Sequence, residues 1–297
     1  MRHLLEIDDL SPAELQRVMA LSTTPDPPRV LAGKGMALLF AKPSARTRNS
    51  MEMAVTQLGG HPVYIQADEV GVDTRESAED VANTLACYHS AIGARVFEHS
   101  TVERMASVDR VPVVNMLSDE AHPLQALADL LTIRRELGSF EGRSVAFIGD
   151  ANNVARSLAL GCGMSGMQFR IASPSGHQFP AADLERIRAT GIEPLVAERP
   201  EDAVSGADVV YTDVWTSMGQ EAEKAQRLSD FEGFCVDERL MGMAQVGAVF
   251  LHCLPAHRGE EVSAEVADGP SSRIWVQAAN RMHAARGLLA WLLGEND

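Results

Sequence analysis

Short runs of apolar residues alternate along the chain with longer stretches in which apolar residues recur at helical spacing. The short runs cover residues 36–40, 63–65, 91–97, 111–116, 145–148, 169–172, 209–211 and 249–251. Strands that each precede a helix are typical of parallel sheets with helices on their faces. The pattern therefore predicts an α/β fold built on central parallel sheets.

Helix-start and helix-stop residues support this interpretation. Ser11, followed by Pro12 and by Glu14, has the form of a capping box with proline in the first turn. Gly59 and Gly138 follow periodic segments and are expected to end helices. The second of these helices is predicted to be long and to begin near His122.

The length of 297 residues predicts two domains. We place the first at 1–137 and the second at 138–279, because a new strand–turn–helix unit begins after Gly138. A last helix is predicted at about 284–293, and we expect the segment from about 280 to 297 to pack back on the first domain.

The formal net charge of −15 disfavours binding to nucleic acid and to anionic membranes. An anionic substrate would therefore require a local positive pocket. No apolar run approaches the ~20 residues of a membrane span, and the start of the chain leads into acidic sequence. We expect a cytoplasmic protein.

The four cysteines, Cys87, Cys162, Cys235 and Cys253, are scattered and form no CxxC pair. This spacing favours reduced thiols over a disulfide framework or a zinc cluster. His252 and His257 lie near Cys253, but no acidic or cysteine partner completes a metal-ligand spacing. We therefore expect no metal site.

The sequence S-A-R-T-R at residues 44–48 joins a predicted strand to a helix that we expect to begin near Thr47. A helix N-terminus offers free N–H groups, and Ser44, Arg46 and Thr47 add hydroxyl and guanidinium donors. The segment is a candidate phosphate cradle. A solvated basic helix start explains this motif alone equally well.

Three further motifs place polar groups where ligands bind in α/β proteins. His122 and Gln125 in H-P-L-Q open one helix, and taken alone this histidine fits a cap or a core residue. The loop D-V-W-T-S-M-G at 213–219 follows a strand, where an ordinary turn is the simpler reading. The segment at 149–153 lacks G-x-G-x-x-G, so Asn152 and Asn153 favour a carboxylate over a dinucleotide.

Together, S-x-R-T-R, H-P-x-Q, D-V-W-x-S-M-G and H-C-L-P (252–255) resemble the motifs of the carbamoyltransferase family, in this order and separation. The third and fourth resemble its ornithine-specific members more than its aspartate-specific members. The resemblance implies a carbamoyl-phosphate domain and an ornithine domain, joined by two helices. It also implies a homotrimer with sites near subunit boundaries, without metal or organic cofactor.

The same resemblance implies roles for individual residues. Carbamoyl phosphate would be bound by Ser44, Ala45, Arg46, Thr47, Arg95, His122, Gln125, Cys253, Leu254 and Arg281. Ornithine would be bound by Asn153, Asp213, Ser217 and Met218. The expected catalytic residues are Arg95, His122, Asp213, Cys253 and Arg281. The side-chain amine of ornithine must lose a proton to attack, and Asp213 with Cys253 could accept or relay it.

Two features depart from the family pattern: Ala45 stands where a threonine is usual, and we expect the loop at 68–75 to be longer than in the family. Alanine keeps the backbone N–H, so we expect activity with weaker carbamoyl-phosphate binding. The alternatives are a carbamoyltransferase for putrescine or an acylated ornithine, and a non-catalytic paralogue that binds carbamoyl phosphate. Arginine metabolism is the expected setting, and the sequence fits both citrulline synthesis and citrulline breakdown.

Overall fold

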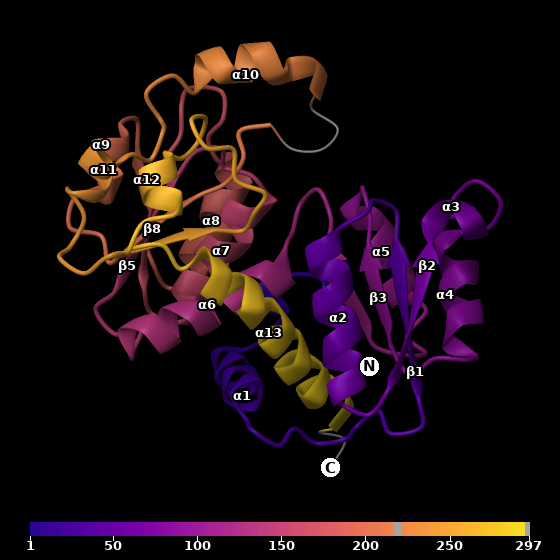
Figure 1. The fold of residues 1–297 in the computed structure, drawn as a ribbon. Coiled ribbons are helices and arrows are strands. Elements are labelled where there is room, and N and C mark those ends of the chain that lie inside the picture. Colours follow the sequence, from indigo (N-terminus) through magenta and orange to yellow (C-terminus); the bar gives the residue numbers. More distant parts are fainter. Residues whose placement is uncertain (217–220, 295–297) are drawn as a thin grey trace. The chain divides into compact units, whose positions relative to one another are not determined.

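The computed structural model describes residues 1–216 and 221–294, which form two compact units (Figure 1). Unit 1 comprises Met1–Leu131 and Ala279–Asp297, and unit 2 comprises Thr132–Ala278. The chain passes between them within two helices, α6 (Pro123–Leu137) and α13 (Ile274–Gly294). Two parallel sheets flanked by helices confirm the predicted fold class.

Unit 1 contains a sheet of four parallel strands in the order β2–β1–β3–β4. These strands are β1 (Gly35–Phe40), β2 (His61–Gln66), β3 (Ile92–Arg95) and β4 (Val113–Leu117). Its helical elements are η1 (Ile7–Asp9), α1 (Pro12–Ser22), α2 (Ala45–Gln57), α3 (Ala67–Val70), α4 (Ala78–Ala86) and α5 (His99–Ser107). Strands β1 and β3 are central and almost wholly buried, which explains their unbroken apolar sequences.

Unit 2 contains five parallel strands in the order β7–β6–β5–β8–β9. They are β5 (Ser144–Ile148), β6 (Gln168–Ala172), β7 (Leu195–Ala197), β8 (Val209–Thr212) and β9 (Val249–His252). Its helical elements are α7 (Asn153–Met164), α8 (Ala181–Ala189), α9 (Pro200–Val204), η2 (Glu221–Glu223), α10 (Lys224–Asp230), α11 (Glu238–Met241) and α12 (Ala264–Ala267). The sequence pattern missed β7, a short edge strand whose Leu195 and Val196 are exposed.

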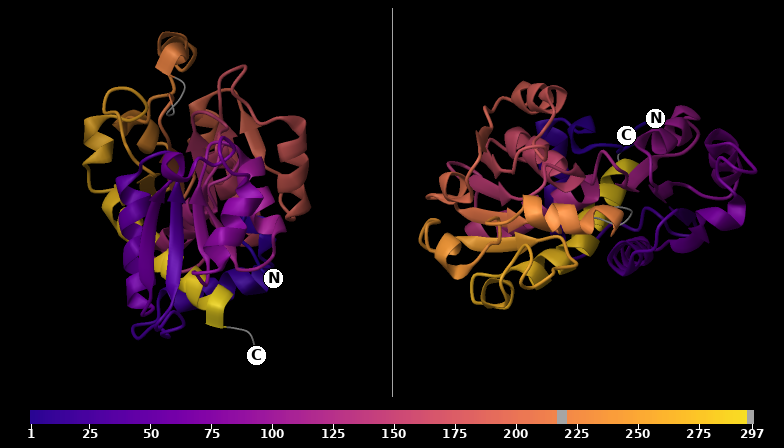
Figure 2. Two further views of the ribbon diagram at one scale, coloured as in Figure 1. Left: turned by 90° about the vertical axis from the view of Figure 1, so that its right-hand side faces the viewer. Right: turned by 90° about the horizontal axis from the view of Figure 1, so that it is seen from above.

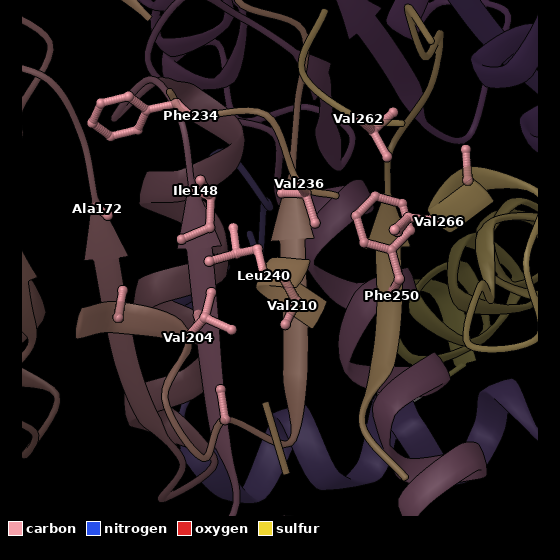
Figure 3. Close-up of a cluster of buried hydrophobic side chains, with 14 of the residues drawn as sticks. Ile148, Ala172, Val204, Val210, Phe234, Val236, Leu240, Phe250, Val262 and Val266 are labelled. Carbon is pink, nitrogen blue, oxygen red and sulfur yellow. The ribbon is translucent and has the colours of Figure 1, made fainter. Parts of the chain in front are cut away.

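The core of unit 2 forms where apolar side chains of β5, β8 and β9 face short covering segments. Figure 3 shows Ile148, Val210 and Phe250 on neighbouring strands, together with Leu240 of α11 and Val266 of α12. All are at most 2% exposed. This packing holds the carboxyl ends of these strands in register, and the candidate polar residues follow those ends.

Most local helix signals act as predicted. Ser11 and Glu14 form the reciprocal capping box of α1, and Gly59 and Gly138 adopt positive φ angles of 83° and 80° after α2 and α6. The prediction for the last helix was wrong at its start. Helix α13 begins at Ile274, so Arg281 lies inside the helix instead of preceding it.

Helix α10 lies at one end of unit 2, beyond the sheet, in Figure 1 and in the left view of Figure 2. Among the residues that the structure describes, none of the helices combines the length and the apolar character needed to cross a membrane.

Candidate active site

The predicted phosphate cradle lies at the junction of β1 and α2 in unit 1. Ser44 is the N-cap of α2: its Oγ accepts a hydrogen bond from the Thr47 amide at 3.3 Å. The Ser44 hydroxyl also donates to Thr47 Oγ1 at 3.2 Å. The helix begins at Ala45, two residues before the predicted start near Thr47, and its first amides thus belong to the S-A-R-T-R turn.

Two guanidinium groups meet at the hydroxyl of Thr47. Arg95, at the carboxyl end of β3, donates to Thr47 Oγ1 at 3.4 Å, and Arg281 of α13 donates to the same oxygen at 3.2 Å. Thr47 is 1% exposed, Arg95 6% and Arg281 4%. Two buried positive charges beside a neutral hydroxyl and a helix N-terminus form an anion-binding environment in an otherwise acidic chain.

His122 lies buried in this positive field. Burial lowers its pKa well below the usual range, and the charges of Arg281, Arg95 and Arg46 lower it further. The imidazole is consequently neutral at physiological pH. A neutral imidazole can donate a hydrogen bond to a carbonyl oxygen that gains negative charge during a reaction.

Gln125 lies one turn along α6 from His122 and is 1% exposed. Its Nε2 donates to Asp129 Oδ1 at 2.7 Å, and its Oε1 accepts a hydrogen bond from Arg281 Nη1. Sequence analysis did not identify Asp129 as part of the site. The sequence does place Asp129 four residues after Gln125 on one helix, a spacing that brings two side chains together.

Arg48, the last residue of the motif, faces away from this cluster. It donates to Glu52 at 2.8 Å along α2, and its guanidinium lies 3.9 Å from the centroid of the Tyr64 ring. It is therefore a helix-surface residue. Arg46 is half-buried and contributes to the positive field at His122.

In unit 2, Asp213 follows the carboxyl end of β8 and is 6% exposed. The Asn152 side chain donates to one of its oxygens at 3.0 Å, and Cys253 Sγ donates to the other at 2.9 Å. Asn152 is the N-cap of α7, and Asn153 is the first residue of that helix. The sequence-predicted Asp213 and Cys253 thus come together within one unit.

His252 supports the segment that follows β9. Its Nδ1 accepts a hydrogen bond from the Leu254 amide at 2.8 Å, so Nε2 carries the proton and donates to Glu261 Oε1 at 3.2 Å. His252 and Glu261 are 1% and 0% exposed. This pair fixes Leu254, which has a positive φ of 65° and precedes a cis peptide bond to Pro255.

Two groups of side chains in the described part of the chain have metal-ligand spacing. One comprises Asp213, His252 and Cys253, and the other comprises His257, Glu260 and Glu261. Both ring nitrogens of His252 already make hydrogen bonds within the protein. In the second group Lys224 Nζ lies 3.0 Å from Glu260, so an ammonium group already neutralises part of its charge.

Arg227 of α10 contacts the D-V-W-T-S-M-G segment at Trp215. It donates to the Trp215 carbonyl and forms an ion pair with Asp150, which follows β5. Burial raises the pKa of Asp150, although Arg227 and His177 oppose that shift. Arg227 was not predicted from the sequence. The predicted ligand residues Ser217 and Met218 lie outside the described residues.

The loop at 68–75, noted as a departure from the family pattern, is held by hydrogen bonds. Asp73, at a positive φ of 57°, forms an ion pair with Arg104 of α5, and its carboxylate also accepts from the Ala78 amide at 3.3 Å. The pairing with Arg104 lowers the pKa of Asp73. The loop is therefore tied to α4 and α5 of its own unit.

Comparison with known protein families matches nearly the whole chain. Residues 2–135 match the family model described as "Aspartate/ornithine carbamoyltransferase, carbamoyl-P binding domain". Residues 141–292 match the model described as "Aspartate/ornithine carbamoyltransferase, Asp/Orn binding domain". The first match contains Thr47, Arg95 and Gln125, and the second contains Asp213, Cys253 and Arg281.

Individual relatives give the same result. The chain is 47% identical over 296 residues to the ornithine carbamoyltransferase of Thermus thermophilus, covering 98% of this chain and 97% of the relative. A solved structure of the Pyrococcus furiosus ornithine carbamoyltransferase superposes with a TM-score of 0.94 at 40% identity, covering 100% of this chain and 98% of that one. An N-acetyl-L-ornithine transcarbamylase mutant superposes with a TM-score of 0.89 at 28% identity, covering 98% and 100%.

Proposed function

This chain belongs to the aspartate/ornithine carbamoyltransferase family, and from that premise we propose that it transfers the carbamoyl group of carbamoyl phosphate to the side-chain amine of L-ornithine. The products are L-citrulline and phosphate. The observation that carries this proposal is the meeting of Arg95 and Arg281 at Thr47, beside the N-terminus of α2. It supplies the anion site that carbamoyl phosphate requires.

The phosphate of the donor is proposed to bind at the N-terminus of α2. The side chains of Ser44, Arg46 and Thr47 donate hydrogen bonds to the phosphate. Ala45 donates through its backbone N–H, which does not depend on the hydroxyl of the usual threonine. Arg95 adds a buried positive charge. As phosphate departs, these fixed donors stabilise its increasing charge without reorganising.

The carbamoyl carbonyl is proposed to face His122 and Arg281, with Gln125 beside its NH2 group. Oxyanion charge develops when the amine attacks this carbonyl, and a neutral imidazole and a guanidinium both donate hydrogen bonds to it. Cys253 and Leu254 are also proposed to contribute to carbamoyl-phosphate binding.

The amino-acid end of ornithine is proposed to bind through Asn153, Asp213, Ser217 and Met218. Asp213 is held by Asn152 and Cys253, so its carboxylate is already oriented before ornithine binds. The attacking amine must be neutral, and the adjoining Asp213–Cys253 pair provides a route for its proton.

The acceptor is proposed to be free ornithine. Relatives that are 40–47% identical to this chain are named ornithine carbamoyltransferases, whereas the N-acetyl-L-ornithine transcarbamylase is 28% identical. Parallel assays with ornithine, N-acetylornithine and putrescine test this assignment. Citrulline should form at a kcat/KM at least about 100-fold above that of either other product, and an equal or higher value for another amine would overturn it.

Assembly and setting are further parts of the proposal. We propose a homotrimer in the cytoplasm that takes part in arginine metabolism, with residues 1–137 and about 280–297 binding carbamoyl phosphate and 138–279 binding ornithine. The described cysteines are free thiols, which supports a reducing compartment. Three chains of 32.1 kDa give 3 × 32.1 = 96.3 kDa, and light scattering on the purified protein measures this mass directly.

A further inference from the structure

We propose that Asp129 is a positioning residue that orients the amide of Gln125, and that it thereby makes the site select acyl phosphates that carry an NH2 group. This inference rests on the proposed function, because it assigns the origin of carbamoyl selectivity at the same site. Asp129 itself would not touch the substrate.

The two ends of the Gln125 amide meet partners of opposite kind. Nε2 donates to Asp129 Oδ1 at 2.7 Å, and Oε1 accepts from Arg281 Nη1. The Asp129 oxygen acts as an acceptor in this contact, and a guanidinium only donates hydrogen bonds. A reversed amide would oppose donor to donor at Arg281 and acceptor to acceptor at Asp129, so the network permits a single orientation.

All three side chains are buried, which makes this orientation energetically important. Asp129 is 0% exposed, Gln125 1% and Arg281 4%. Water cannot readily replace a lost partner at such a site, and an unsatisfied buried polar group is costly. Asp129 therefore also restricts the rotamer of Gln125, since releasing the hydrogen bond would take this partner away from the buried Nε2 group.

The fixed orientation turns the Gln125 oxygen toward an arginine of the anion site. Arg281 bonds to Gln125 Oε1 through one nitrogen and to Thr47 Oγ1 through the other, so Oε1 lies on the side of the phosphate cradle. A carbonyl oxygen has two lone pairs, and the second can accept from a carbamoyl NH2. An acetyl group offers only a methyl there and would leave this lone pair unpaired.

Two phosphonates of nearly equal size isolate this contact: phosphonoacetamide carries the NH2 group, and acetonylphosphonate carries a methyl in its place. Isothermal titration calorimetry on the full-length protein gives a dissociation constant for each, and contacts to the phosphonate cancel in their ratio. The wild-type protein should prefer phosphonoacetamide about fivefold or more, the value of one net hydrogen bond.

Asp129→Leu removes the acceptor and should reduce this preference to that of Gln125→Met, which lacks the amide altogether. Asp129→Asn retains an oxygen that can accept from Gln125 and should keep most of the preference. If Asp129→Leu does not fold, Asp129→Ala removes the same acceptor without added bulk. The control is Arg286→Met, which breaks a different buried network on α13, with Gln57 and Ser22, and should leave the ratio unchanged.

A wild-type ratio in Asp129→Leu or Asp129→Ala would overturn the inference. The inference would also be overturned if Asp129→Asn lost the preference as completely as Asp129→Leu. The preference would then not depend on a hydrogen-bond acceptor at position 129. Failure of the wild-type protein to bind either phosphonate would instead remove the proposed function, and the inference with it.

Discussion

The clusters in the two units have the same structural origin and opposite chemistry. In both, polar side chains lie at or just after the carboxyl ends of parallel strands, β1 and β3 in unit 1 and β8 and β9 in unit 2, and in unit 1 helix α13 adds Arg281. Unit 1 places Arg95 and Arg281 around a hydroxyl, whereas unit 2 places the carboxylate of Asp213 against the thiol of Cys253. The comparison shows that topology supplies the location and individual side chains supply the charge.

Each cluster is held by hydrogen bonds within its own unit. Substitutions in unit 1 should therefore weaken carbamoyl-phosphate binding and turnover, and substitutions in unit 2 should act on ornithine and on proton transfer.

Arg281→Leu should cause the greatest loss. It removes a buried charge that bonds to Gln125 and Thr47, and it removes a donor for the oxyanion, so kcat should fall about 10²- to 10³-fold. Steady-state kinetics with carbamoyl phosphate as the varied substrate measure the loss. Arg48→Leu is the matched control: this exposed arginine pairs with Glu52 of α2 and lies over the ring of Tyr64 of β2, and kcat should stay within about twofold. Equal losses in the two variants would refute the distinction between them.

Asp213→Asn should lower kcat/KM for ornithine about 100-fold, because the variant keeps the size of the side chain and loses the charge that binds an ammonium group. Calorimetry should find the dissociation constant of phosphonoacetamide within about twofold of the wild-type value. A large change in that constant would contradict the division between the two clusters.

Cys253→Ala should have a smaller effect, of about tenfold on turnover. The thiol donates to Asp213, so its removal should also change the pH profile of kcat if it takes part in proton transfer. The profile is measured from pH 6 to 10 at saturating substrates. A profile identical to that of the wild type would rule out this proton route.

The smallest expected effect is a pH dependence of stability that comes from His122. Burial and Arg281 hold its folded-state pKa well below the value of ~6.5 expected in the unfolded chain. As the pH falls below ~6.5, the unfolded state binds a proton that the folded state rejects, so this histidine lowers stability by at most about 1.4 kcal/mol per pH unit. Above ~6.5 it contributes no slope.

Urea unfolding of the wild-type protein and His122→Gln at pH 5 to 8 tests this sign. The variant should gain stability relative to the wild type as the pH falls from 6.5 to 5, since the other titrating groups are shared. A difference that stays constant with pH would show that His122 is protonated with an ordinary pKa in the folded protein.

The sequence predicted the fold well where local patterns decide the structure. The central strands are almost wholly buried, so their apolar runs were visible, and the caps at Ser11 and Gly138 depend on neighbouring residues. Strand β7 was not predicted, because its side chains are partly exposed at a sheet edge. The start of α13 at Ile274 was not predicted, because residues 274–283 mix apolar and polar side chains without a clear capping signal.

The site was only partly predictable for a related reason. Asp213 and Cys253 lie in recognisable motifs, and the structure brings them within hydrogen-bonding distance. Asp129, Glu261 and Arg227 act through other residues, and their partners are defined by packing in three dimensions. A buried carboxylate within a helical apolar pattern signals such a residue, but the sequence does not state which side chain it holds.

The central claim is most directly tested by incubating the purified protein with carbamoyl phosphate and L-ornithine and measuring citrulline and phosphate together across a range of pH. Citrulline and phosphate should form in a one-to-one ratio, faster than carbamoyl phosphate decomposes without protein. Phosphate release without citrulline, or no release above the background at any pH, would contradict it.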